Sequence, residues 1–367
     1  MSSSAAVTVV VPTAGRVELT RSCLESVRVA SGVEAVPVDI VVVDSSSPDD
    51  QERLTLICEQ LDVELLPGPR SVSEKRNLGA EHALTQYVMF LDSDCVIAAG
   101  CLGAHLSRLT DETVDASQGK VLFQGPERLA FRAIRCSGLL NAFLPASGTP
   151  VQTACAGNLM VRRASFLDLR FDPRLGPPGL GGEDVDFGLR LLEAGGRFVG
   201  TPEAVVYHET ITWNSFIADF RRFLAWGRSE AHLIERHPAS SYLDMPSPVL
   251  VALALLLASA VSAIASPLAL LAFPVGLITY GLIMAGVGAM KHRDDRLGGA
   301  LGHWVFFILD AGRVIESILR TRPSSAFKRL RFAEDQVTQE WSDLVPIAWA
   351  EWLTTLTVIV FLWWSVK

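Results

Sequence analysis

Charged residues are scarce in this chain. They make up 20% of its 367 residues, whereas apolar residues make up 49% and the mean hydropathy is +0.31. A soluble enzyme usually carries more charge, so this composition indicates that part of the chain lies in a membrane. A basic excess is also lacking, since 32 basic residues stand against 40 acidic ones. The net charge of −8 argues against a nucleic-acid-binding protein, which needs a basic face.

Three common motifs are missing as well. The six cysteines show neither C-x-x-C nor zinc-finger spacing, so we expect buried thiols in a reducing compartment. No G-x-G-x-x-G follows the first β-branched run, which disfavours an NAD-dependent Rossmann enzyme. The first residues lack the basic and apolar stretches of a signal peptide, and we therefore expect the N-terminal domain in the cytoplasm.

Charge is unevenly distributed along the chain. Residues 1–248 hold 22 basic and 31 acidic residues, whereas residues 249–367 hold 10 and 9, so the net charge changes from −9 to +1. An acidic globular part therefore precedes a nearly neutral, apolar part. This shift predicts a cytoplasmic domain over residues 1–240 and a membrane region over residues 241–367.

The C-terminal part contains long apolar segments. No charged residue occurs over the 42 positions from Val249 to Met290. A membrane span needs about 20 apolar residues, so this run predicts two helical spans. A third apolar segment has Glu351 as its single charge. The expected spans are 249–266, 268–290 and 345–366, which would make the protein a multi-pass protein of the cell membrane.

Residues 301–319 are apolar on one face but carry Asp310, Arg313 and Glu316 at three-residue intervals. We expect an amphipathic helix at the membrane interface here, and a fourth span is the alternative. Basic residues without acidic ones follow between 320 and 331, which places this segment on the cytoplasmic side.

Apolar runs alternate with helical patterns in the N-terminal part. Short runs rich in β-branched residues predict strands at 7–11, 38–43, 63–66 and 87–91. Helical spacing separates them at 17–30, 51–61 and 74–84. This alternation is typical of an α/β domain with a parallel sheet, in which ligands bind at the carboxyl ends of the strands. Polar residues that follow different strands, such as Asp44 and Asp92, are therefore expected to converge.

Several of these polar residues could take part in catalysis. Asp92 and Asp94 directly follow a strand and could face one hard cation, Mg²⁺ or Mn²⁺, although acidic residues are also common in turns. Glu183 and Asp184 begin a predicted helix, where they would serve as helix-capping carboxylates or as a general base. His208 ends a strand and would be a structural residue or a third metal ligand.

A cluster of arginines lies in the helical pattern near residue 225. Arg221, Arg222 and Arg228 would bind phosphate oxygens or form a cationic collar at the membrane surface. The sequence leaves both readings open.

Seven short motifs stand in order over roughly 200 residues. They read V-V-V-P-T at 9–13, V-V-V-D-S-S-S-P-D at 41–49, K-R-N-L-G at 75–79, F-L-D-S-D at 90–94, A-G-N-L-M-V-R-R at 156–163, G-G-E-D-V-D-F at 181–187 and V-V-Y-H at 205–208. Each is modest alone, but the ordered set is specific. The set resembles the family 2 glycosyltransferases, which have the Rossmann-like GT-A nucleotide-sugar fold. The resemblance covers about residues 7–228 and leaves out the membrane helices.

The resemblance implies roles for individual residues. Asp184 would be the catalytic base, and Glu183 would assist acceptor binding. Asp94 would hold the divalent cation that bridges the diphosphate, with Asp92 and His208 in the same metal site. Donor and nucleotide contacts would come from Pro12, Thr13, Arg16, Asp44, Lys75, Arg76, Asn77, Asp92, Gly157 and Asn158.

The sequence departs from the family pattern at two places. Ser45 follows Asp44 where many relatives have a second Asp, so the base contacts are expected to differ. The Q-x-x-R-W motif of processive members is absent, which favours addition of a single sugar. The resemblance then implies an inverting transfer from a UDP-, GDP- or dTDP-sugar to a hydroxyl of a lipid-linked or glycolipid acceptor at the cytoplasmic face.

Three alternatives stay open. A polyprenyl-phosphate sugar synthase would use the lipid phosphate as acceptor and would need no strong base. A nucleotidyltransferase would need a glycine-rich triphosphate loop, which P-T-A-G-R at 12–16 matches poorly. A catalytically inactive membrane scaffold would have no reason to keep the three aspartates of the site together.

Overall fold

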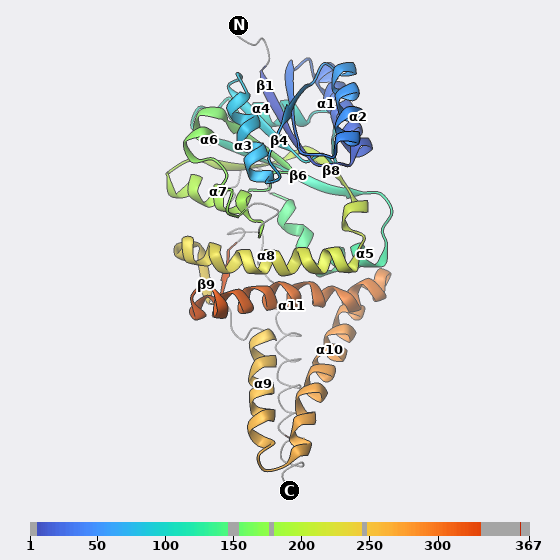
Figure 1. Ribbon diagram of the computed structural model, residues 1–367, viewed down its shortest axis with the longest axis vertical. Coiled ribbons are helices and arrows are strands. Elements are labelled where there is room, and N and C mark those ends of the chain that lie inside the picture. The colour runs from blue at the N-terminus through green and yellow to red at the C-terminus, as the bar shows by residue number, and fades with distance from the viewer. Residues whose placement is uncertain (1–5, 146–153, 176–179, 244–247, 332–359, 361–367) are drawn as a thin grey trace. The chain divides into compact units, whose positions relative to one another are not determined.

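The computed structural model describes residues 6–145, 154–175, 180–243 and 248–331, together with residue 360 (Figure 1). These residues form two compact units. Residues up to 126 and residues 141–212 form the first, here called the sheet unit. Residues 127–140 and 213–330 form the second, here called the helical unit. The predicted third span, 345–366, falls outside the described residues apart from position 360.

The sheet unit is built around one eight-stranded sheet with the strand order β3-β2-β1-β4-β7-β6-β8-β5. Its strands are β1 (Val7–Thr13), β2 (Val38–Asp44), β3 (Glu64–Pro67), β4 (Tyr87–Leu91), β5 (Cys95–Ile97), β6 (Ala116–Gln124), β7 (Asn158–Arg162) and β8 (Phe198–Glu209). Its helices are α1 (Val17–Glu34), α2 (Pro48–Gln60), α3 (Val72–His82), α4 (Cys101–Leu109), α6 (Arg163–Leu169) and α7 (Glu183–Glu193).

Both faces of the sheet are covered by helices. Val7, Val9 and Val11 of β1 pack in a cluster with α1, α2 and α4, whereas Val10 packs with α3, α6 and α7 on the other face. Because successive strand residues point to opposite faces, a strand covered on both sides must be apolar throughout. All seven residues of β1 are buried, as the continuous apolar run predicts.

The predicted alternation of strands and helices is confirmed, but the sheet is mixed rather than parallel. β1 pairs in parallel with β2 and β4, and β2 with β3. β7 then runs antiparallel to both β4 and β6. The patterns of single strands cannot reveal this change of direction, because it depends on how the chain between β4 and β7 returns to the sheet.

The topology gathers the expected polar residues at one edge of the sheet. Thr13 lies opposite Asp44 at the ends of β1 and β2. Asp92 follows directly on Leu91, the last residue of β4, which is the other parallel neighbour of β1. Carboxyl ends of adjacent parallel strands meet at the same edge, so residues from three distant segments converge there.

The helical unit consists mainly of five helices. These are α5 (Leu129–Ser137), α8 (Phe216–Arg236), α9 (Pro248–Ser262), α10 (Ala272–Lys291) and α11 (Arg296–Leu319). Short 3-10 turns η3 (Pro238–Ser240), η4 (Pro267–Leu271), η5 (Arg293–Asp295) and η6 (Pro323–Phe327) connect them, and β9 (Ser241–Leu243) pairs with β10 (Lys328–Leu330). Two further turns, η1 (Leu139–Phe143) and η2 (Thr210–Trp213), lie where the chain passes from one unit to the other.

Helices α8 and α11 run side by side at very close range (Figure 1). A Cβ added to Gly227 of α8 would lie 1.9 Å from the Leu309 oxygen, and one added to Gly312 of α11 would lie 2.3 Å from the Leu224 oxygen. Only glycine therefore fits at either position. This packing places α8 in the helical unit, whereas the sequence predicts a domain boundary at residue 240.

Asp310, Arg313 and Glu316 of α11 are buried, which corrects the expectation of a helix with its polar face toward lipid head groups. Asp310 and Arg313 are both 0% exposed and form an ion pair at 2.6 Å. Glu316 accepts hydrogen bonds from Arg228 and His232 of α8. The three-residue spacing therefore marks the face that packs on α8. A buried charge needs such a partner, because its desolvation is otherwise uncompensated.

The described residues contain one helical stretch that is long and apolar enough to cross a membrane, Pro267–Lys291, with a mean hydropathy of 2.1. The shorter apolar helix Ala252–Ser262 occupies the place of the first predicted span. At about 1.5 Å per residue, α9 with its 15 residues falls short of a typical bilayer core. The multi-pass arrangement expected from the sequence is thus not supported by this part of the chain.

Candidate active site

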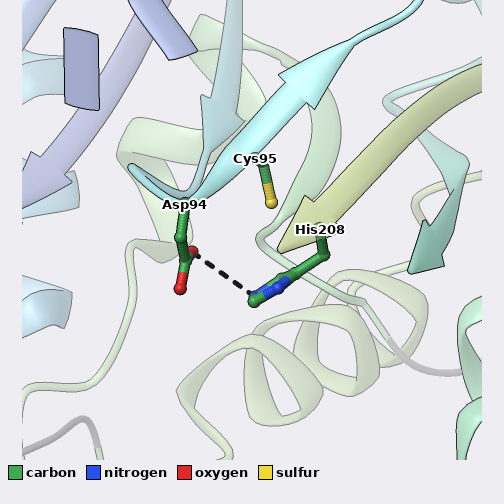
Figure 2. Close-up of side chains that lie close together, drawn as sticks. All are labelled: Asp94, Cys95 and His208. Carbon is green, nitrogen blue, oxygen red and sulfur yellow. Dashed lines mark ion pairs between the residues drawn. The ribbon is translucent and has the colours of Figure 1, made fainter. Parts of the chain in front are cut away.

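The predicted metal ligands Asp94 and His208 lie together at the edge of the sheet (Figure 2). Asp94 precedes β5, and His208 lies on β8 directly opposite Cys95 in the antiparallel β5–β8 pair. The Nε2 atom of His208 is 3.4 Å from Oδ1 of Asp94, and both side chains are largely buried. Arg16 completes the group by donating to Oδ2 of Asp94 at 2.7 Å.

The donor atoms of this group fit a divalent cation of the Mn²⁺ type. Ligand atoms of Asp94, Cys95 and His208 lie within 4.8 Å of one another. Burial, reinforced by the charges of Asp92 and Asp94, holds the pKa of the Cys95 thiol well above its ordinary value. A protonated thiol is a poor ligand, so the usable donors are carboxylate oxygen and imidazole nitrogen, which suit Mn²⁺.

Arg76 of α3 connects the two acidic motifs. Its guanidinium group forms ion pairs with Asp92 at 2.6 Å and with Glu183 at 2.7 Å. Burial by itself would raise the pKa of Asp92, but the charges of Arg76, His208 and Arg16 and the hydrogen bond from Arg76 together outweigh it, and the pKa of Asp92 is lowered. Asp92 is therefore held ionised beside the cation site.

The carboxylates at the start of α7 behave differently. Burial, followed by the charge of Asp184, raises the pKa of Glu183 from 4.5 to about 7, although Arg76 opposes this shift. Burial likewise raises the pKa of Asp184, against the charge of Arg76 and hydrogen bonds from the amides of Ala156 and Val185. A buried carboxylate with a raised pKa is suited to accept a proton as a general base.

The ends of β1 and β2 form the predicted nucleotide side of the site. Asp44 is buried, and its Oδ1 accepts hydrogen bonds from the amide and the hydroxyl of Ser46. Its Oδ2 is buried without a hydrogen-bond partner. An orphaned buried carboxylate oxygen is costly, so this atom is suited to accept a bond from a ligand N–H group.

The loop after β1 has a backbone shape that brings it close to this carboxylate. Gly15 and Arg16 both have left-handed φ values, 70° and 57°. The amide of Gly15 donates to the hydroxyl of Ser46 at 2.6 Å. Ser46 thus joins the two strand ends, a role that its position in a serine-rich turn did not reveal.

Lys75 is buried at the same strand ends. Its ammonium group donates to the carbonyl oxygen of Thr13, and burial lowers its pKa. Thr13 itself is held by Thr20, with 3.1 Å between the hydroxyl oxygens, and Pro12 beside it is buried. The buried support of the expected nucleotide site is therefore formed by Lys75, Thr13 and Pro12.

The side chains of two predicted contact residues form hydrogen bonds within the protein. The side-chain amide of Asn77 both donates to the carbonyl of Phe171 and accepts from its amide. Asn158 is 0% exposed, donates to the carbonyls of Lys120 and Ala204, and accepts from His105. Asn158 thus has both of its amide N–H groups engaged within the protein, whereas the amide nitrogen of Asn77 donates one hydrogen bond.

Gly157 lies beside the acidic motif that follows β4. A Cβ at this position would lie 3.3 Å from Oδ2 of Asp92, a tight contact. The absence of a side chain therefore lets the turn before β7 lie against Asp92.

The two arginines predicted to bind phosphate are paired within the helical unit. Arg222 bonds Asp219 at 3.1 Å, and its guanidinium carbon lies 4.3 Å from the centre of the Trp213 ring. Arg228 bonds Glu316 at 2.8 Å. Each positive charge thus already has a carboxylate partner.

One residue at the site escaped the sequence reasoning altogether. Gln118 of β6 is 3% exposed and hydrogen-bonds the turn that leads to Gly157. Gln118 is a polar residue in the buried first half of β6, which is the one sign of its role in the sequence. Its partner Cys155 lies 37 residues further along the chain.

Residues 8–170 match the family model described as Glycosyl transferase family 2. This match agrees with the α/β fold of the described residues and with the order of the sequence motifs. The matched segment ends before α7, so it covers Asp94 but neither Asp184 nor His208.

Curated proteins are also similar to parts of this chain. The chain is 31% identical over 243 residues to the pre-mycofactocin glycosyltransferase of Mycobacterium tuberculosis, covering 63% of this chain and 48% of that protein. It is 33% identical over 165 residues to the succinoglycan biosynthesis protein ExoM of Rhizobium meliloti, covering 42% of this chain and 48% of that protein. The chain thus spans about half the length of the curated relatives it matches.

Among solved structures, the chain is similar to the mannosyltransferase PcManGT from Pyrobaculum calidifontis, solved in complex with GDP-Man and Mn²⁺. The sequence identity is 15% and the TM-score is 0.48, over 99% of this chain and 88% of that one.

Proposed function

We propose that this chain is a nucleotide-sugar-dependent glycosyltransferase that adds a single sugar to an acceptor hydroxyl. One observation carries the proposal: Arg76 joins Asp92 to Glu183, so the acidic motif beside Asp94 and the motif that contains Asp184 belong to one site. Such an arrangement places a cation-binding group next to a candidate base, which sugar transfer from a diphosphate donor requires.

The site residues divide the chemistry between them. Asp94 and His208 would hold a divalent cation, which would offset the negative charge that develops on the leaving nucleoside diphosphate. Arg16 forms an ion pair with Asp94, and Arg76 forms one with Asp92, so both arginines add positive charge beside the proposed cation. Asp44 offers its free Oδ2 to the nucleoside base at the far strand end.

Asp184 is the proposed base. Two backbone amides, of Ala156 and Val185, hold its carboxylate at 3.1 and 2.9 Å. From this fixed position it would take the proton of an acceptor hydroxyl, and the oxygen would attack the anomeric carbon opposite the leaving diphosphate. A single displacement of this kind inverts the configuration of the sugar.

The donor can be tested without knowing the acceptor. Purified protein would be screened for thermal stabilisation by UDP-, GDP- and dTDP-sugars with Mn²⁺, because a ligand that binds only the folded state raises the melting temperature. Stabilisation by one class that Asp44→Ala abolishes supports the proposal. Absence of stabilisation and of donor hydrolysis with all three classes contradicts it.

We further propose that the acceptor is lipid-linked and that the helical unit attaches the protein to the cytoplasmic face of a membrane. Support comes from the apolar stretch Pro267–Lys291 and from α11, which exposes the apolar side chains of Trp304, Ile315 and Leu319. An exposed apolar face flanked by basic residues is suited to a lipid surface.

The acceptor class has its own test. Membranes containing the protein would be incubated with a radiolabelled nucleotide sugar, and label is expected in the organic extract. Label confined to water-soluble products contradicts a lipid acceptor. Full activity of Asp184→Asn would instead indicate a lipid phosphate acceptor, which needs no strong base.

A further inference from the structure

A tight turn before β7 touches both acidic motifs of the site. The amide of Asn158 donates to the carbonyl of Cys155 at 3.1 Å and closes this turn, here called the 155–158 turn. Within it, the amide of Ala156 donates to Oδ2 of Asp184 at 3.1 Å, and Gly157 lies against Asp92. The orientation of the proposed base therefore depends in part on the position of the Ala156 N–H group, since the other bond comes from the adjacent amide of Val185.

Gln118 holds this turn from the neighbouring strand. Its Oε1 accepts from the amide of Cys155 at 2.7 Å, and its Nε2 donates to the carbonyls of Cys155 at 3.3 Å and of Asn158 at 3.0 Å. The pairing of β6 with β7 ends where Gln118 faces Leu159. Beyond that point the Gln118 side chain, instead of the β6 backbone, forms the hydrogen bonds to Cys155 and Asn158.

The helix that bears the base lies close to the same segment. A Cβ added to Gly188 of α7 would lie 2.9 Å from the amide nitrogen of Ala154. Glycine here lets α7 approach the chain just before the turn. The distance from Ala156 to Asp184 is thus fixed from two sides, by the packing of α7 and by the Gln118 amide.

We propose that Gln118 is a positioning residue for Asp184: it holds Cys155 at both its N–H and its C=O and so aims the Ala156 N–H at the Asp184 carboxylate. The inference rests on the proposed function, in which Asp184 is the base. Gln118 contacts no reacting group and acts through the backbone of the 155–158 turn.

The electrostatic surroundings show what loss of this hydrogen bond would do. Burial raises the pKa of Asp184, whereas Arg76 and the two backbone amides lower it and Asp92 opposes them. Glu183 and the Cys155 thiol also face this carboxylate. Without the Ala156 bond, Asp184 would hold its proton to a higher pH.

The test replaces the Gln118 side chain by one of similar length without an amide, Gln118→Met. We expect kcat to fall about 10- to 100-fold, because general-base catalysis depends on alignment, while KM for the donor stays within about twofold. The acidic limb of the pH–rate profile is expected to move to higher pH. A merely structural role would lower the amount of folded enzyme without moving this limb.

Thr85→Val provides the matched control. Thr85 is a buried residue of the sheet unit whose hydroxyl bonds Thr8 and the carbonyl of Tyr87, away from the turn. This variant loses interior hydrogen bonds too, but kcat and the pH profile should remain those of the wild type. Should Gln118→Met fail to fold, Gln118→Glu retains an acceptor for the Cys155 amide and is expected to show the same changes at smaller size.

Amide hydrogen exchange gives a readout that needs no activity. In Gln118→Met the amides of Cys155, Ala156 and Asn158 should exchange faster than in the wild type, and in Thr85→Val they should not. Unchanged exchange, or an active variant with wild-type kcat and pH profile, overturns the role of Gln118. A wild-type protein that neither transfers nor hydrolyses any donor overturns the proposed function instead.

Discussion

At the scale of single residues, Glu183 links the site to the pH dependence of stability. Its pKa is raised from 4.5 to about 7, mainly by burial. The folded state therefore binds this proton more tightly than the unfolded state, and stability is lost as the pH rises from about 4.5 through 7. In Glu183→Gln the melting temperature should vary less with pH over this range. If the melting temperature of the variant depends on pH as strongly as that of the wild type, this dependence arises from another group.

The metal site makes a second prediction at this scale. His208→Ala should raise the Mn²⁺ concentration needed for half-maximal activity by about 10- to 100-fold, because it removes the nitrogen donor beside Asp94. Cys95→Ala is the matched control, since the Cys95 thiol lies in the same group but stays protonated. Metal titrations of both variants decide the matter, and equal effects would contradict the assignment of His208.

At the scale of elements, the contact between α8 and α11 depends on two glycines. Gly227→Ala and Gly312→Ala would each drive a methyl group into the backbone of the other helix. Overpacking of this kind costs about 1–3 kcal/mol. Gly286→Ala on α10 meets no atom within 4 Å, and as a helix-interior change it should be neutral or stabilising by up to about 1 kcal/mol. Thermal unfolding of the three variants in detergent measures the difference, and equal melting temperatures would contradict the close packing.

Elements also differ in how well the sequence predicted them. The strand predicted at 87–91 has those bounds, because its apolar run is short and is followed by a polar turn. β8 extends from Phe198 to Glu209, although the sequence indicates only its end near His208, because pairing with β6 and β5 holds residues without a strand pattern. The polar spacing of α11 was recognised, but the sequence could not say that α8, rather than the membrane surface, covers it.

At the scale of the whole molecule, the sequence placed the carboxylates of the site but not what supports them. Asp92 and Asp94 follow a strand end, and topology brings such ends together. The roles of Asn77, Asn158 and Gln118 depend on partners 37 to 94 residues away in the chain. No local pattern distinguishes an amide that contacts a ligand from one that holds a loop, since both sit in polar positions near the same strands.

The membrane attachment of the helical unit gives the last prediction. Ile318 on α11 is 56% exposed, and Val33 on α1 of the sheet unit is 70% exposed, so both positions accept a probe. Ile318→Cys and Val33→Cys would be labelled with an environment-sensitive dye and reconstituted in vesicles that contain brominated lipid. Because five of the six native cysteines are buried and the pKa of the sixth, Cys155, is raised, background labelling should be low.

The dye at 318 should be quenched several-fold more than the dye at 33, since an apolar face in contact with lipid brings it near the acyl chains. Equal quenching at the two positions would show that α11 does not lie at a lipid surface, and the lipid-linked acceptor would lose its main support.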